Sequence, residues 1–289
     1  MRDVSIIIVN YNTKVLTKDC INSVVLWTKD INYELIVVDN DSSDGSIDYL
    51  KESQKDIKII ESKTNLGFGK ANNLGVSDAN GKYIFLLNSD TVLLNNAVKL
   101  FFDYIEIADK NTGAIGSLLL DKNLNQIHSS GFFPNKWNFF RKLFINDDKF
   151  KERIIFGEEN YFDVDYLTGA NIFMLKSTFE KLNGFDEDFF MYYEDTDLQR
   201  RMGAKGLKRQ IIKGPKIIHL EGASSKKLSN KKRAMLLKSM LLYFKKHSTR
   251  YSFRLYKILF FLLSFLREIF NNYTFKESRK FLKIIIDIK

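Results

Sequence analysis

The sequence of 289 residues contains one cysteine and only two prolines. Cys20 therefore has no partner for an internal disulfide, and no group of residues has the spacing of a structural zinc site, so we expect a reducing compartment. With 15 glycines and so little proline, collagen-like and proline-rich classes are excluded. Hydrophobic residues make up 45% of the chain and include 25 Phe and 13 Tyr, which is enough for a folded core and argues against disorder.

Long hydrophobic runs are also missing. The apolar run of residues 5–9 ends in the polar residues 10–12 without a small-residue cleavage site, so we predict no signal peptide. Near the other end of the sequence, Ile258 to Leu266 spans only nine residues between Lys257 and Arg267. Crossing a bilayer takes about 20 apolar residues, so we do not expect a transmembrane helix.

Positive charge is concentrated at one end of the chain. Residues 1–230 carry 30 Lys and Arg against 32 Asp and Glu, or −2, whereas residues 231–289 carry 15 against 3, or +12. A near-neutral body with a basic tail favours a catalytic domain that docks on an anionic membrane over a nucleic-acid-binding protein. We predict a catalytic domain over 1–230 and basic amphipathic helices over 231–289. The alternative that these helices pack on the body or form a homo-oligomer stays open, with Met235, Leu241 and Phe260 as contact residues.

Short β-branched runs alternate with helical segments through the first hundred residues. This alternation predicts an α/β fold with a mostly parallel sheet and helices on both faces, because parallel neighbours need crossover connections. The predicted strands are Ser5–Val9, Glu34–Val38, Ile57–Ile60 and Tyr83–Leu87, and the helices between them are Leu16–Trp27, Gly45–Glu52 and Lys70–Ser77. Further strands are expected over Ile115–Leu120, Val164–Leu175 and Arg209–Leu220, and further helices over Ser177–Gly184 and from Tyr193 to Gly206.

Polar residues follow each of the first four strands, at the edge where open α/β sheets bind ligands. They are residues 10–12, 39–45, 65–69 and 88–90. A dinucleotide-binding enzyme would need G-x-G-x-x-G directly after the first strand. That position holds Tyr-Asn-Thr, so NAD binding is excluded.

Two aspartates end strands at this edge. Asp39 is positioned to accept the imide N–H of uracil or thymine, and Asp90 to supply the oxygen ligand that a hard divalent ion holding a diphosphate requires. Taken alone, each is also explained as an ordinary turn aspartate.

A third group of acids lies between residues 184 and 201. Glu194, Asp195 and Asp197 follow an aromatic loop and open a predicted helix. Some of them can be helix-capping acids, but an aromatic wall beside a carboxylate also suits a sugar site, where the carboxylate takes the proton of a hydroxyl. The aromatic residues of the loop can equally belong to the core. His219 ends a late strand, where a structural role is the common one.

Together these segments resemble the family 2 glycosyltransferases with the GT-A fold, especially the rhamnosyltransferase-like branch. The resemblance covers about residues 4–225 and lies in an ordered set of motifs. They are Ser5-Ile-Ile-Ile-Val-Asn-Tyr-Asn, Glu34-Leu-Ile-Val-Val-Asp-Asn-Asp-Ser-Ser-Asp-Gly-Ser, Asn65-Leu-Gly-Phe-Gly-Lys-Ala-Asn-Asn-Leu-Gly, Leu86-Leu-Asn-Ser-Asp, the segment from Gly184 to Arg200, and His219-x-x-Gly-x-Ser.

The resemblance implies roles for individual residues. It assigns Asn10, Tyr11 and Asp39 to the binding of the nucleoside and places Asn73 near the donor. Asp90 matches the last acid of the D-x-D motif and would hold Mg²⁺ or Mn²⁺, with His219 joining the metal or diphosphate site. The earlier motif positions are Asn88 and Ser89, so a second carboxylate ligand is missing. Asp195 matches the catalytic base.

The implied activity is inverting transfer of a sugar, with rhamnose as one candidate, from a dTDP- or UDP-type donor. The acceptor would be a glycan or a lipid-linked molecule of bacterial surface polysaccharide synthesis, and the enzyme would lie on the cytoplasmic face of the cell membrane. Two alternatives are a sugar nucleotidyltransferase, which would want a glycine-rich basic loop near residue 10, and a noncatalytic membrane scaffold, which would not need Asp90 and Asp195 in this register.

Overall fold

The computed structural model describes residues 2–53, 57–134, 156, 159–220 and 230–270, together with residues 283 and 286. Residues 221–229, which include Gly222 and Ser224 of the last motif, lie outside the described residues, as do most of residues 271–289 and the side chain of Phe260.

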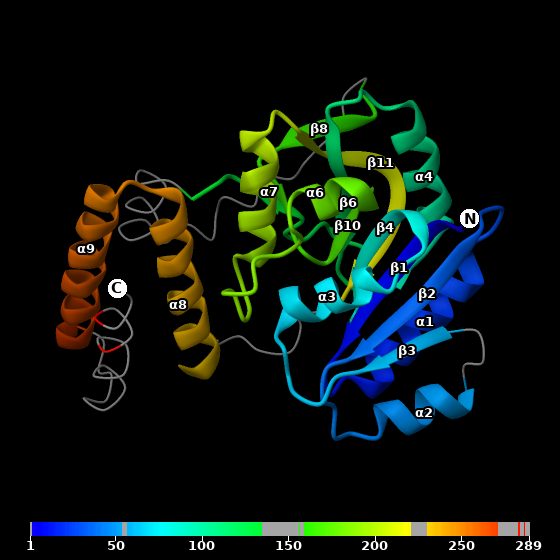
Figure 1. Ribbon diagram of the computed structural model, residues 1–289, viewed down its shortest axis with the longest axis horizontal. Coiled ribbons are helices and arrows are strands. Elements are labelled where there is room, and N and C mark those ends of the chain that lie inside the picture. Colours follow the sequence, from blue (N-terminus) through cyan, green and yellow to red (C-terminus); the bar gives the residue numbers. More distant parts are fainter. Residues whose placement is uncertain are drawn as a thin grey trace.

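A nine-stranded sheet forms the centre of the molecule, in the order β3-β2-β1-β4-β10-β6-β11-β5 with β8 also paired to β11 (Figure 1). A two-stranded sheet joins β7 to β9. The strands are β1 (Arg2–Asn10), β2 (Tyr33–Asp39), β3 (Ile57–Glu61), β4 (Gly81–Asn88), β5 (Thr91–Leu93), β6 (Thr112–Leu120), β7 (Ser130–Gly131), β8 (Tyr161–Val164), β9 (Tyr166–Leu167), β10 (Asn171–Leu175) and β11 (Lys208–His219).

Helices cover both faces of the sheet, as the sequence predicts. Along β1, Ile6 and Ile8 enter one hydrophobic core and Ile7 enters the other, because successive side chains of a strand point to opposite faces. Residues of α1, α2 and α4 fill the first core, and residues of α3, α6 and α7 fill the second. The helices are α1 (Lys14–Trp27), α2 (Ser46–Ser53), α3 (Phe68–Ser77), α4 (Ala97–Ile107), α6 (Lys176–Lys181), α7 (Glu194–Ala204), α8 (Asn230–His247) and α9 (Arg250–Phe270).

The sheet differs from the prediction in its second half. β1 to β4 are parallel neighbours, but β10 inserts antiparallel between β4 and β6. The segment Val164–Leu175 is therefore not one strand, because β8 pairs with β11 while β10 pairs with β4. β9 and a turn that contains Gly169 lie between β8 and β10. The helix predicted to end at Gly184 already ends at Lys181, and α4 was not predicted at all.

α8 packs beside the loop that precedes α7, and α9 packs against α8 on its outer side (Figure 1). Phe189 of this loop is buried together with residues of both helices. These are Leu241, Tyr243 and Phe244 of α8 and Phe253 and Tyr256 of α9. Leu241 therefore packs on the body, as the alternative interpretation of the tail expects. Among the described residues, no helix is long and apolar enough to cross a membrane.

Candidate active site

Asn10 and Asp39 are paired in the parallel register of β1 and β2, at the carboxyl ends of both strands. Both side chains are fully buried, and Asn10 Nδ2 donates a hydrogen bond of 2.6 Å to Asp39 Oδ2. The other carboxylate oxygen of Asp39 accepts the N–H of Ser42 at 2.9 Å. These contacts fix the loop after β2. Because both side chains are buried, their contact with a nucleoside stays a prediction.

Tyr11 and Asn73 lie in different surroundings. Tyr11 follows β1 and is 46% exposed, so its ring is available to a ligand. Asn73, on α3, instead forms two hydrogen bonds with the backbone of Phe185. Its Nδ2 donates to the carbonyl oxygen at 2.8 Å, and its Oδ1 accepts the N–H at 2.9 Å. In this structure Asn73 supports the start of the loop before α7, and its contact with a donor stays a prediction.

Asp90 and His219 come together although 129 positions separate them in the sequence. β5 pairs antiparallel with the end of β11, which sets His219 opposite Thr91. Asp90 Oδ1 lies 3.3 Å from His219 Nε2, and both side chains are largely buried. Asn88 Nδ2 lies 3.5 Å from the same nitrogen, and Asn88 Oδ1 is a buried oxygen without a hydrogen-bond partner.

This cluster fits a divalent cation in part. Among the described residues, no group of three His, Cys, Asp or Glu side chains could hold a metal ion. Asp90 and His219 offer one oxygen and one nitrogen ligand, and the unpartnered Asn88 Oδ1 is an acceptor beside them. Because Mg²⁺ is commonly held by one or two protein carboxylates plus substrate phosphates, a diphosphate would have to complete the shell.

Asp195 lies in the first turn of α7 with part of its side chain open to solvent. Its Oδ2 accepts the N–H of Gly169 at 2.8 Å, and its Oδ1 accepts the N–H of Thr196 at 2.6 Å. Burial among protein atoms raises the pKa of Asp195 above its ordinary value, although these hydrogen bonds act in the opposite direction. A carboxylate with a raised pKa is a stronger proton acceptor than a solvated one.

The two acids beside Asp195 have separate environments. Burial, and then the charge of Asp195, raise the pKa of Glu194 well above its ordinary value, and Glu194 Oε2 has no hydrogen-bond partner. Asp197 is also buried, but hydrogen bonds from His247 at 2.7 Å and Arg201 at 2.8 Å outweigh the burial and lower its pKa. The surroundings of Glu194 therefore favour its protonated form, whereas Asp197 is stabilised in its ionised form by two partners.

The loop before α7, residues 184–193, forms hydrogen bonds to the start of α3 on one side and to α8 on the other. On one side, Phe68 N–H donates to the carbonyl oxygen of Phe190 at 3.0 Å. Gly67 has a φ of +80°, and a Cβ there would lie 2.1 Å from that oxygen, so only glycine fits this approach. On the other side, Ser239 Oγ of α8 donates to the carbonyl oxygen of Met191 at 2.7 Å.

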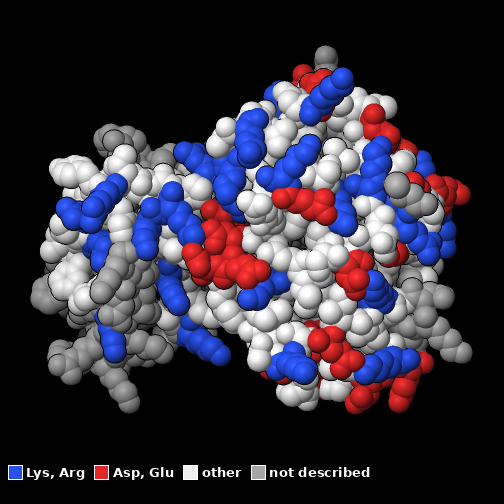
Figure 2. All heavy atoms as spheres, viewed as in Figure 1, with Lys and Arg blue, Asp and Glu red and all other residues white. Residues whose placement is uncertain are grey.

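The contacts of α8 with this loop and with α7 could not be seen in the sequence. His247 was without context there, yet it binds Asp197, and its ring lies 4.7 Å from that of Tyr243. Lys246 forms ion pairs with Asp186 and Asp188, both at 2.7 Å. Figure 2 shows a group of acidic side chains between the body and the basic side chains around α8. No local spacing signals contacts between residues 50 to 60 positions apart.

His128 and Gly169 were missed in the same way. The charge of His128 lowers the pKa of Asp195, against the larger effect of burial. Gly169 holds Asp195 through its backbone N–H, and its own Cβ position is 3.2 Å from the Phe68 ring. In the sequence, Gly169 lies within the apolar segment Val164–Leu175, which is predicted as a single strand, so nothing there indicates its contact with Asp195.

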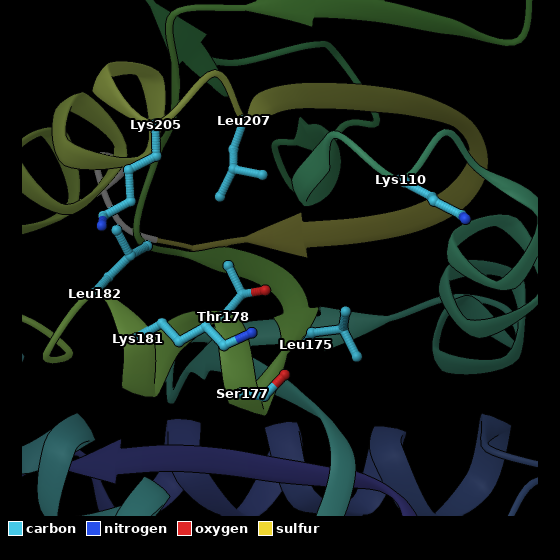
Figure 3. Close-up of a pocket in the computed structure, with 8 residues that line it drawn as sticks. All are labelled: Lys110, Leu175, Ser177, Thr178, Lys181, Leu182, Lys205 and Leu207. Atoms are coloured by element: carbon cyan, nitrogen blue, oxygen red, sulfur yellow. The ribbon is translucent and has the colours of Figure 1, made fainter.

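One further hollow, of about 500 Å³, does not belong to this site (Figure 3). Lys110 and Lys205 border it just before β6 and β11 begin, so it lies at the opposite ends of these strands from His219. In Figure 3 the ammonium groups of these two lysines point away from each other, and they do not converge on a common ligand position.

Comparison with known proteins identifies the family of the chain. The family model described as glycosyl transferase family 2 matches residues 5–167, more than half of the chain. The chain belongs to this family. A second model, described as the N-terminal domain of galactosyltransferase, matches residues 158–223, which include α7.

Similar curated proteins include rhamnosyltransferases. Rhamnosyltransferase WbbL of Escherichia coli is 28% identical over 61% of this chain and 69% of its own length. An N-acetylglucosaminyl-diphospho-decaprenol L-rhamnosyltransferase of Mycobacterium tuberculosis is 22% identical over 66% of this chain and 67% of its own length. An uncharacterized glycosyltransferase of Haemophilus influenzae is 34% identical over 40% of this chain, but the match spans only 36% of that protein. Within this family the chain is thus similar to rhamnosyltransferases.

Solved structures confirm the predicted GT-A fold. GalNAc-T7, in complex with UDP, GalNAc and Mn²⁺, aligns with a TM-score of 0.64 and 13% identity over 99% of this chain and 55% of its own. The mannosyltransferase PcManGT of Pyrobaculum calidifontis, with GDP-Man and Mn²⁺, aligns with a TM-score of 0.56 and 17% identity over 85% of this chain and 66% of its own. At these identities the likeness concerns the fold alone.

Proposed function

We propose that this glycosyltransferase is inverting and metal-dependent, and that it transfers a sugar such as rhamnose from a dTDP- or UDP-type donor to a hydroxyl of a glycan or lipid-linked acceptor in bacterial surface polysaccharide synthesis. One observation carries the proposal. Asn88 N–H, at the end of β4, donates to the carbonyl oxygen of Ala170 at 3.0 Å, and the N–H of the preceding Gly169 holds Asp195. Backbone hydrogen bonds therefore connect the diphosphate side of the site to the base.

Asp195 is the group that we assign to the acceptor. Its raised pKa suits it to remove the proton from a hydroxyl as that oxygen attacks the anomeric carbon. A double displacement would need a second ionised carboxylate as nucleophile. Of its neighbours, Glu194 has a raised pKa that disfavours its ionised form, and Asp197 is engaged by Arg201 and His247. This difference among the three acids supports a single displacement with inversion.

Asp90 and His219, with Asn88 beside them, are the residues that would hold Mg²⁺ or Mn²⁺. A bound divalent ion would neutralise charge on the departing diphosphate. The chain itself orients the two ligands, because the pairing of β5 with β11 fixes both backbones. Asn10 and Asp39 shape the nucleoside edge, and much of the rate enhancement would come from such positioning.

The test is release of nucleoside diphosphate by the purified protein from dTDP-rhamnose, UDP-hexoses and GDP-sugars, with and without Mn²⁺. The anomeric configuration of the product, read by NMR, decides between inversion and retention. Release that requires an acceptor and gives an inverted product supports the proposal. Retained configuration refutes the single displacement, and incorporation of a nucleotide into a sugar phosphate favours the nucleotidyltransferase instead.

The same proposal puts the enzyme on the inner face of the cell membrane, where a lipid-linked acceptor would be reached. The +12 charge of residues 231–289 and exposed apolar side chains on α9 support this docking. Sedimentation with anionic vesicles tests it, and formation of a homodimer through α9 is the contrary outcome.

A further inference from the structure

The two faces of α9 differ in what they contact. Phe253 and Tyr256 are each 7% exposed and pack in the cluster with α8. Tyr251, Leu255 and Ile258 are 80%, 47% and 58% exposed. With Leu262, they recur at the spacing i, i+4, i+7 and i+11, which places them in one stripe on the side of the helix opposite the buried pair.

A basic groove runs beside this apolar stripe. It has a volume of about 480 Å³ and is lined by Lys245 of α8 and by Arg250, Phe253, Arg254 and Lys257 of α9. The three basic residues of α9 again follow the helical spacing i, i+4 and i+7, one step around the helix from the stripe. Between residues 230 and 267 the sequence has no Asp or Glu, so neither helix supplies an acid to this groove before that point.

We propose that the groove between α8 and α9 binds the phosphate of an anionic membrane phospholipid while the apolar stripe of α9 lies among the acyl chains. The inference rests on the membrane docking proposed above and names its site. An apolar stripe flanked by Lys and Arg is the arrangement with which a helix lies in a membrane interface, and Tyr251 supplies an aromatic ring at its start. Two copies meeting through this face would bring basic grooves together, and their like charges would oppose the contact.

The groove is connected to the active site through α8. Lys245 lines the groove, whereas the adjacent Lys246 forms ion pairs with Asp186 and Asp188 of the loop before α7. His247 then binds Asp197 in the first turns of α7. A lipid held in the groove therefore fixes the orientation of the loop and of Asp195 relative to the membrane surface.

The experiment uses the full-length protein and vesicles of phosphatidylcholine with and without phosphatidylglycerol, in a sedimentation assay at low salt. Arg250→Gln with Arg254→Gln removes two basic residues from the groove. At about fivefold in affinity for each basic residue at an anionic surface, binding should weaken about thirtyfold. The matched control, Lys122→Gln with Lys213→Gln, removes the same charge from exposed positions of the body and should leave binding nearly unchanged.

A second variant separates the stripe from the groove. Leu255→Ser with Ile258→Ser should abolish most binding while keeping all basic residues, because both side chains are exposed and do not support the fold. Equal loss in the groove variant and the body control would overturn the proposal, since net charge alone would then explain binding. Failure of the wild type to bind anionic vesicles, or concentration-dependent dimers lost in the stripe variant, would also overturn it.

Failure of the proposed function is recognised separately. Circular dichroism and thermal unfolding check that each variant is folded, and nucleoside diphosphate release with a soluble acceptor should be the same in the groove variant and the wild type. Vesicle binding without any glycosyl transfer would refute the enzymatic proposal and leave the lipid site standing. Glycosyl transfer without vesicle binding would refute the lipid site and leave the enzymatic proposal standing.

Discussion

Replacing His247 by alanine tests whether α8 holds the catalytic segment in place. The change removes the hydrogen bond to Asp197, whose side chain is 2% exposed, and leaves Arg201 as its remaining ionic partner. A hydrogen bond to a charged group contributes about 1.5 to 3 kcal/mol, and loss of the ring contact with Tyr243 adds about 0.5 to 1 kcal/mol. We therefore expect His247→Ala to lower the free energy of unfolding by about 2 to 4 kcal/mol.

Activity should fall for the same reason. Asp197 lies one helical turn into α7, two residues after the proposed base, so loosening it disturbs the position of Asp195. Even small misplacement of a reacting group can reduce turnover by about 10². The affinity for nucleoside diphosphate should stay the same, because Asp90 and His219 are untouched. Urea unfolding, turnover and calorimetry measure these three quantities.

The adjacent residue provides the control. Lys246 forms two ion pairs with the loop, but its side chain is 28% exposed and its partner Asp188 is 68% exposed. Exposed ion pairs contribute about 0 to 1 kcal/mol, so Lys246→Ala should change stability much less than His247→Ala. Equal stabilities of the two variants, or normal turnover of His247→Ala, would refute the reasoning that a buried hydrogen bond from α8 supports α7.

Three further outcomes are expected. Asp195→Asn should reduce turnover by about 10² or more with donor binding intact, and near-normal turnover would transfer the role of base to another acid. Asp90→Ala should weaken Mn²⁺-dependent binding of dTDP or UDP in calorimetry, and unchanged affinity would exclude Asp90 as a ligand. Because Glu194 has a raised pKa in the folded protein, the unfolded chain loses its proton first, and the contribution of Glu194 to stability should fall as the pH rises above the unfolded value of about 4.5. Glu194→Gln lacks this proton loss, so urea unfolding should show its stability relative to wild type rising by at most about 1.4 kcal/mol per pH unit above that value, and a constant difference would contradict a neutral Glu194.

The first half of the fold was predictable because its signals are local. β1 is a short apolar run in which Ile6 and Ile8 enter one core and Ile7 enters the other, and the lengths of such runs distinguish strands from helices. The helices between successive strands supply the crossover connections that parallel neighbours need. The antiparallel insertion of β10 has no such signal, because its neighbours β4 and β6 are set by pairings between distant segments.

The candidate site was also predictable only where its signals are local. Asp90 and Asp195 could be proposed from motifs, since each follows or begins an element at a recognisable place. The residues that control their environment could not. His247 approaches Asp197 from 50 positions away, and Gly169 contributes a backbone N–H, which leaves no mark in the residue type. Which of three neighbouring acids is neutral, paired or reactive therefore depends on packing that spacing alone does not determine.

Because α8 contacts the loop before α7, truncating the chain would not isolate the role of the C-terminal helices. Cutting the chain at Asn230 would remove the basic groove, but it would also expose Phe189, which is 1% exposed in the structure, and leave Asp197 without His247. A loss of activity in such a fragment would then reflect a loosened loop as much as a lost membrane contact. Substitutions on the exposed stripe of α9 touch only the outer face, because Leu255 and Ile258 lie opposite the pair that packs on α8. The role of the membrane is therefore separable from the role of α8 by point variants and not by truncation.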